Sequence, residues 1–215
     1  EIISQANWTR PVYVATTVGQ ENYLNLGDNF IREGLANRIT PFTTKGPGMK
    51  NFDTEKTYDN VMNRYKWGGM ERKGLYVDET VMRMCYTHRH LMADLALQLI
   101  AEGKNDKALN VLRKSEKVLP NYNVPNNYIS GAADLAKAYA LLGKKADAQR
   151  IINQVWADSK QYAKWYVGLD GSLFAMSQNE ALKYIYIMQA TSDVENIISE
   201  SKARAMMKEI DAVYS

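Results

Sequence analysis

The chain has 215 residues, of which 46% are hydrophobic and 24% charged, and its formal net charge is +3. This composition is that of an ordinary globular protein with a sizeable core. The charge is too small and too evenly spread to indicate a nucleic-acid partner or an anionic membrane surface. No segment reaches the roughly 18 consecutive apolar residues of a membrane span, so we expect the fragment to be soluble. The single cysteine, Cys85, excludes an intrachain disulfide framework but leaves the compartment open.

The first part of the chain is predicted to mix strands with short helices. Residues 12–18 are β-branched and aromatic and follow Pro11, which favours a strand. Residues 29–37 have the pattern of one or two helical turns, and residues 38–42 that of a second extended piece that its proline ends. The run 44–48 contains Gly-Pro-Gly and predicts a loop.

Helices are predicted to dominate the rest of the chain. Asp53 can cap a first helix, whose apolar positions recur every three or four residues until Gly68–Gly69. Asp78 can cap the next helix. The further predicted helices span residues 79–102, 106–118, 126–142, 145–164, 178–190 and 193–213.

Two capping boxes support the starts of the last two predicted helices. Ser177 precedes Glu180, and Ser192 precedes Glu195, at the three-residue spacing that lets side chains and backbone amides satisfy each other. The chain is thus expected to be mainly α, with an α+β N-terminus.

Small and large residues recur at the offsets of a 34-residue tetratricopeptide repeat. The first copy comprises Ala96, Leu99, Gly103, Ala108, Leu112 and Pro120, and the second comprises Ala136, Tyr139, Gly143, Ala148 and Ile152. The alanines are expected to be small because two helices cross closely there, and the glycines to end a helix. Tetratricopeptide-like helical hairpins are therefore predicted at 89–122 and 129–162, with a degenerate hairpin at 177–214.

The domain prediction is an N-terminal αβ segment, residues 1–77, that packs on the hairpins of residues 78–215 to give one compact unit. Two clear repeats are fewer than the three that usually suffice for stability. The predicted groove positions are also mostly apolar, which favours a groove covered by the N-terminal residues. They are His90, Ala93, Leu97, Ile100, Ser130, Ala133, Lys137 and Ala140. The rival interpretation is an exposed groove that binds a partner.

No pattern of catalytic or metal-binding residues stands out. The richest reactive cluster comprises Met82, Met84, Cys85, His88, His90 and Met92. A soft-metal site is one interpretation, but Met and Cys are ordinary core residues and no second cluster completes a coordination sphere. There is neither a Gly-x-Ser-x-Gly nucleophile elbow nor a phosphate-binding loop. We therefore predict no catalytic residue, metal or cofactor for this fragment.

An aromatic cluster near the end of the second hairpin is the best binding candidate. It comprises Tyr162, Trp165, Tyr166 and Phe174. Such rings can stack on a sugar, and the alternative is that they are buried between two helical pairs.

Several strings in the first 155 residues resemble one protein family. They are Asn7–Ala15, Tyr23-Leu24, Glu33–Ala36, Arg38, Asn60–Asn63, Tyr65–Gly68 and Arg83–Cys85. They resemble the C-terminal soluble region of bacterial multi-pass membrane proteins of unknown function, whose membrane half is similar to a type C glycosyltransferase and is often labelled protein O-mannosyltransferase-like. Val14 and Asn37 depart from that pattern. Arg10, Tyr13 and Arg38 belong to these strings and complete the candidate binding residues.

The resemblance implies a periplasmic domain that follows the last membrane span of a parent protein upstream of Glu1. Since the acidic catalytic residues of that enzyme class lie in the membrane half, the resemblance implies that this fragment is inactive alone. We expect a non-catalytic accessory domain that binds acceptor protein, glycan or a partner subunit. The alternatives are a free-standing peptide-binding adaptor that uses its groove and a glycan-active enzyme.

Overall fold

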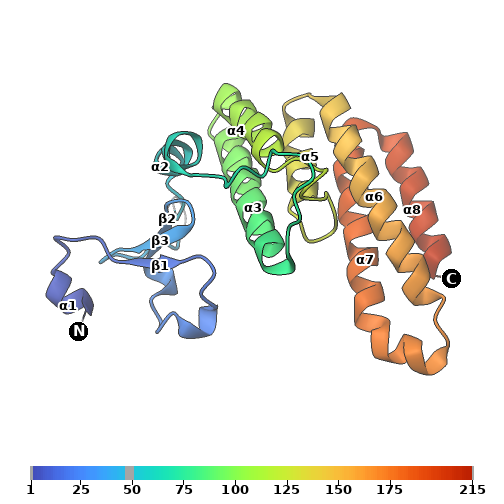
Figure 1. Cartoon of the computed structure of the whole chain (residues 1–215), viewed down its shortest axis with the longest axis horizontal. Coiled ribbons are helices and arrows are strands. Elements are labelled where there is room, and N and C mark those ends of the chain that lie inside the picture. Colours follow the sequence, from blue (N-terminus) through green and yellow to red (C-terminus); the bar gives the residue numbers. More distant parts are fainter. Residues whose placement is uncertain (1, 47–50, 215) are drawn as a thin grey trace. The chain divides into compact units, whose positions relative to one another are not determined.

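The protein is mainly helical, with a small antiparallel sheet near its N-terminus (Figure 1), as the sequence predicts. The computed structural model describes residues 2–46 and 51–214. The chain divides into two compact units, Glu1–Lys66 and Trp67–Ser215. We refer to them as the N-terminal unit and the helical unit.

The N-terminal unit is built around a three-stranded sheet in the order β1-β3-β2. Its regular elements are α1 (Ile2–Ala6), β1 (Tyr13–Ala15), β2 (Phe30–Arg32), β3 (Ala36–Ile39) and α2 (Thr54–Asp59). Phe30 and Ile39 are paired across β2 and β3, and both are buried. The sheet therefore has a small core of its own.

The helical turns predicted over residues 29–37 are wrong, because this stretch forms the β2–β3 hairpin. Its turn is closed by a hydrogen bond from the Glu33 amide to the Ala36 carbonyl, 2.9 Å long. Gly34 in the turn has a φ of +98°, which is easily reached only by glycine. The pairing of β3 with strands on both sides outweighs the weak local helix signal.

The predicted cap of the first long helix is confirmed, but the predicted length of that helix is not. Asp53 caps α2 by accepting a hydrogen bond from the Lys56 amide. The helix ends sooner than predicted, because a wider turn at Asn60–Arg64 follows it and the backbone is extended at Tyr65. In the predicted loop, residues 44–46 are irregular, and Pro47 and Gly48 lie outside the described residues.

The helical unit consists, over its described residues, of paired helices that lie side by side (Figure 1). They are α3 (Glu79–Ala101), α4 (Asn105–Val118), α5 (Ala132–Leu141), α6 (Lys145–Val167), α7 (Gly171–Ile198) and α8 (Glu200–Tyr214). α3 packs on α4, α5 packs on α6, and α7 packs on both α6 and α8. Asp78 caps α3, as predicted, by accepting a hydrogen bond from the Val81 amide.

The two predicted repeats share one packing pattern. Their alanines, at positions 96, 108, 136 and 148, are completely buried. Gly103 and Gly143 follow α3 and α5 with φ values of +74° and +71°. The predicted packing roles are confirmed, since the alanines let the helices approach closely and the glycines reverse the chain after each first helix.

The predicted helix over residues 126–142 begins later, at Ala132, because polar side chains fix the preceding stretch as turns. Asn121 accepts a hydrogen bond from the Asn126 amide, and the Ser130 hydroxyl accepts one from the Asn127 amide. Side chains of this type compete with helical backbone hydrogen bonds.

The Ser177 and Ser192 capping boxes are wrong, since both serines lie inside the continuous helix α7. Ser192 instead donates a hydrogen bond to the Ala203 carbonyl of α8. The break between α7 and α8 falls at Ser199, whose backbone is extended. The ends of α7 are therefore set by its packing against α6 and α8 and not by the local capping motifs.

The segment before α3 contacts the helices of its own unit. The Asn123 side-chain amide donates to the Met70 and Arg72 carbonyls, and the Tyr122 hydroxyl donates to the Glu71 carbonyl. The predicted packing of the remaining N-terminal residues on the hairpins stays a prediction.

A buried arginine organises the connection between α4 and α5. Arg89 on α3 is only 1% exposed. It donates hydrogen bonds to three backbone carbonyls, those of Leu119, Val124 and Pro125, at 2.5–3.0 Å. Burial lowers the pKa of Arg89 to about 10, so the guanidinium still carries its charge at neutral pH.

Substituting Gly131 with alanine is expected to destabilise the helical unit more than the same change at Gly143. Both glycines have positive φ, which costs other residues about 1–2 kcal/mol. Only at Gly131 would the new Cβ also lie 2.9 Å from His90 Nδ1 and 3.1 Å from the His90 backbone nitrogen, whereas nothing lies within 4 Å at Gly143. Thermal unfolding of both variants measures the difference, and equal losses of stability would contradict the close approach.

Candidate functional site

Five aromatic side chains gather between α6, α7 and the turn before α5. We call Tyr128, Tyr162, Trp165, Tyr166 and Tyr184 the aromatic cluster. The Tyr184 ring is at its centre, with ring centroids 5.0 Å from Tyr162, 5.8 Å from Tyr166 and 4.4 Å from Tyr128. Trp165 meets Tyr166 edge to face at 4.7 Å. The cluster joins three segments that are far apart in the sequence.

The helical repeat explains how the cluster forms. Tyr162 and Tyr166 are four residues apart on α6, so both rings lie on one face of that helix, toward α7. Tyr184 is buried and belongs to a core cluster that includes Ala163 and Met188. Burial and the neighbouring Tyr128 raise the pKa of Tyr184, so this phenol stays neutral and is suited to contact rather than to proton transfer.

The cluster contains three of the four predicted aromatic residues, and their rings pack on one another with mixed exposure, while the predicted stacking on a sugar stays a prediction. Tyr162 is 43% exposed and Trp165 58% exposed, whereas Tyr166 is partly buried. Phe174, the fourth predicted residue, is partly buried near the start of α7 and is not among the five rings. Tyr128 and Tyr184 were missed, because only the packing of α5, α6 and α7 brings them to Tyr162.

A groove of about 760 Å³ lies beside the cluster and shares Tyr128 with it. Its exposed apolar side chains are Ile129, Leu182 and Tyr186, which are 45%, 42% and 68% exposed. At its rim, Lys183 pairs with Glu180 at 2.6 Å. The groove is therefore an open, mainly apolar surface depression with a charged edge.

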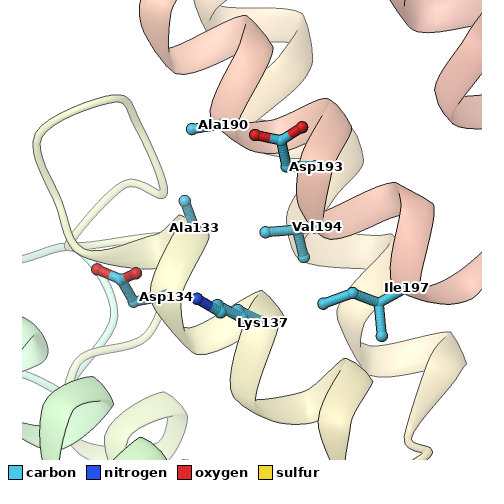
Figure 2. A pocket seen from close by; sticks show the side chains of 7 residues that line it. All are labelled: Ala133, Asp134, Lys137, Ala190, Asp193, Val194 and Ile197. Atoms are coloured by element: carbon cyan, nitrogen blue, oxygen red, sulfur yellow. The ribbon is translucent and has the colours of Figure 1, made fainter.

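A smaller pocket of about 330 Å³ lies between α5 and α7 (Figure 2). Ala133 and Lys137, both predicted groove residues, line it on α5, and Val194 and Ile197 face them from α7. Its carboxylates, Asp134 and Asp193, were not anticipated. Burial, followed by the charge of Asp94, raises the pKa of Asp134. This part of the predicted groove is thus charged as well as apolar.

Of the predicted Met, Cys and His cluster on α3, Cys85 and Met92 belong to the core, whereas Met84 is exposed and the other members are partly buried. Cys85 is buried, and burial raises the pKa of its thiol. Burial lowers the pKa of His88, whose ring meets Trp67 edge to face at 5.5 Å. Among residues 2–46 and 51–214, no group of three or more His, Cys, Asp or Glu could hold a metal ion.

Two of the three candidate binding residues of the N-terminal unit meet around a buried carboxylate. The Tyr13 hydroxyl donates to Glu33 Oε2 at 2.8 Å, and Arg38 Nε pairs with Glu33 Oε1 at 2.6 Å. Lys56 Nζ also pairs with Glu33 Oε2, at 2.5 Å. We call these four residues the Glu33 cluster. Arg10, the third candidate, is exposed outside it.

The electrostatics of the Glu33 cluster keep its carboxylate ionised. The Glu33 side chain is 2% exposed, and burial alone would raise its pKa. Hydrogen bonds from Lys56, Arg38 and Tyr13 outweigh that effect and lower the pKa of Glu33. The cluster ties β1 and β3 to α2, and its two cations retain part of their exposure to solvent.

Part of the N-terminal unit matches a known protein family. Residues 1–56 match the family model of TMEM260-associated domain 2. The matched segment holds the whole sheet and ends at Lys56, the last member of the Glu33 cluster. It links the N-terminal unit to a membrane-protein family of unknown function. No curated protein and no solved structure matches the chain.

A membrane-spanning helix needs roughly 18 or more mostly apolar residues. None of the helices in residues 2–46 and 51–214 is both long enough and apolar enough to cross a membrane.

Proposed function

We propose that this chain is a non-catalytic interaction domain of a larger membrane protein, and that the face formed by α6 and α7 contacts a protein partner. The match of residues 1–56 to a domain associated with a membrane protein supports the first part. The exposed rings in and beside the apolar groove support the second part, above all Tyr186, which lines the groove and is 68% exposed.

The character of the groove favours a protein segment over a sugar. Its walls are mostly apolar, and Tyr and Trp are the side chains that most often dominate protein interfaces. A sugar site needs several polar groups that converge on the ligand. Here Lys183 and Glu180 already pair with each other at the rim.

We further propose that the helical hairpins are tetratricopeptide-like and that the domain faces the periplasm beside a glycosyltransferase-like membrane half. The shared packing pattern around Gly103 and Gly143 supports the first point. The resemblance of the N-terminal strings to bacterial membrane proteins supports the second.

A displayed peptide library selected on the full chain tests the groove. Peptides that bind the wild type are expected to lose about 30-fold in affinity on Tyr186→Ala, because central interface aromatics contribute roughly 2 kcal/mol or more. Met207→Ala, which changes a side chain on α8 that is 38% exposed outside the groove, is the matched control and should leave affinity unchanged. Peptide binding that is insensitive to Tyr186→Ala, or binding of arrayed glycans without any peptide, would overturn the proposal.

The free-standing adaptor that uses the groove predicted along α3 and α5 remains the second candidate. The pocket of Figure 2 supports its α5 part, since Ala133 and Lys137 line that pocket opposite α7. Hydrogen exchange separates the two. A selected peptide should slow exchange in α7 around Tyr186 under our proposal, and in α5 around Ala133 under the alternative.

A further inference from the structure

A cavity of about 310 Å³ lies between α6, α7 and α8 and is separate from the aromatic groove. We call it the α8 cavity. Its apolar wall includes Ile152, Trp156 and Met206, and its polar wall includes Gln149, Glu195 and Lys202.

Glu195, which lines this cavity, is a buried acidic residue with an incompletely bonded side chain. Its side chain is completely buried. Gln149 Nε2 donates to Glu195 Oε2 at 2.6 Å, but among the described residues no group bonds to the buried oxygen Oε1. Buried carboxylate oxygens are normally satisfied, so one that lacks a donor is costly and marks a place where a donor can bind.

The two lysines at this cavity bond to side chains other than Glu195. Lys202 Nζ donates to Gln149 Oε1 at 3.3 Å, and Lys160 pairs with Glu209 at the cavity edge. No ion pair joins Glu195 to a described cation within 4 Å. Because Lys202 is exposed and its hydrogen bond is long, it can move aside at little cost. Of the two glutamates that line the cavity, Glu209 is therefore paired with Lys160, whereas Glu195 has no cationic partner in the described part of the chain and the nearby Lys202 is weakly held.

We propose that the α8 cavity binds an arginine side chain of a protein partner. The guanidinium donates to Glu195 Oε1, lies against the Trp156 indole and displaces Lys202 from Gln149. Arginine fits because its planar group both pairs with carboxylates and stacks on aromatic faces, while its methylene stem packs on apolar side chains. Ile152 and Met206 provide that apolar surface. The inference does not depend on the aromatic groove.

The probe for this site is N-acetyl-arginine amide, titrated into the full chain. The readout is the indole N–H resonance of Trp156 in a ¹H–¹⁵N spectrum, assigned by its loss in Trp156→Phe. We expect a saturable shift with a dissociation constant on the order of millimolar, as for one side chain. N-acetyl-citrulline amide, the neutral analogue, should give no saturable shift, and N-acetyl-lysine amide a weaker one. Absence of the arginine shift, or equal shifts with citrulline or lysine, would overturn the proposal.

Variants test the assigned contacts. Glu195→Gln is expected to weaken arginine binding at least tenfold, whereas Glu200→Gln, an exposed change on α8 outside the cavity, should leave it unchanged. Lys202→Met removes the competing ammonium from an exposed position and is expected to raise the affinity about threefold or more. The Lys202→Met test remains valid even if the Glu195 variant does not fold. Unchanged affinity in Lys202→Met would therefore by itself contradict the site.

Discussion

Replacing Arg89 with methionine is expected to lower the free energy of unfolding of the helical unit by about 3 kcal/mol or more. Each of the three carbonyls that lose a donor would cost roughly 1–3 kcal/mol of stability. The variant no longer has to bury a charged guanidinium, which offsets part of this loss. Urea unfolding followed by helical circular dichroism measures the loss. A variant as stable as the wild type would show that the connection from Leu119 to Pro125 does not need these hydrogen bonds.

The matched control is Arg150→Met. Unlike Arg89, Arg150 pairs with a carboxylate, that of Glu116, and its side chain is 44% exposed. Exposed ion pairs contribute about 0–1 kcal/mol, so the control should change stability by less than the Arg89 variant. Arg89→Lys should resemble Arg89→Met more than the wild type, because one ammonium cannot reproduce the guanidinium fork.

Glu33→Gln is expected to destabilise the N-terminal unit by about 2 kcal/mol, because Arg38 and Lys56 lose a buried ionic partner while remaining partly solvated. Hydrogen exchange of the backbone amides in β1 and β3 reports on this unit directly, and their protection should fall. Asp28→Asn is the control, since Asp28 pairs with Lys45 at a site where both side chains are more than half exposed.

The same cluster predicts a dependence on pH. The pKa of Glu33 is lower in the folded protein than its ordinary value of 4.5. Its contribution is therefore complete above about pH 4.5 and is lost as the pH falls through the lowered folded pKa. Protection of the N-terminal unit should drop in this acid range in the wild type and less in Glu33→Gln. Equal acid sensitivity of the two proteins would contradict the assignment.

The sequence predicted the first two hairpins well because their signals are local. Small residues at the helix crossings, such as Ala96 and Ala108, and the glycines after α3 and α5 act within one hairpin. The β2–β3 hairpin and the continuous α7 were not predicted. Their forms depend on partners distant in sequence, namely β1 for the sheet and α6 and α8 for the helix.

The candidate site, like the fold, was predicted only where its signals are local in the sequence. The spacing of Tyr162 and Tyr166 on one helix is visible in the sequence, so the aromatic cluster was partly predicted. Tyr184 and Tyr128 join it only once α7 and the turn before α5 are packed in place. The Glu195 oxygen that lacks a hydrogen-bond donor could not be predicted. The Ser192 capping box places Glu195 in the first turn of a helix, whereas it lies buried within α7.

The late start of α5 creates a mismatch in helix length. At 1.5 Å per residue, the 10 residues of α5 give about 15 Å of helix, against about 35 Å for the 23 residues of α6 and about 42 Å for the 28 of α7. The far ends of α6 and α7 therefore project beyond α5 as a two-helix arm (Figure 1). Trp165, Leu173 and Met176 are exposed along that arm. Changes there can alter what the domain binds without repacking the hairpins that support it.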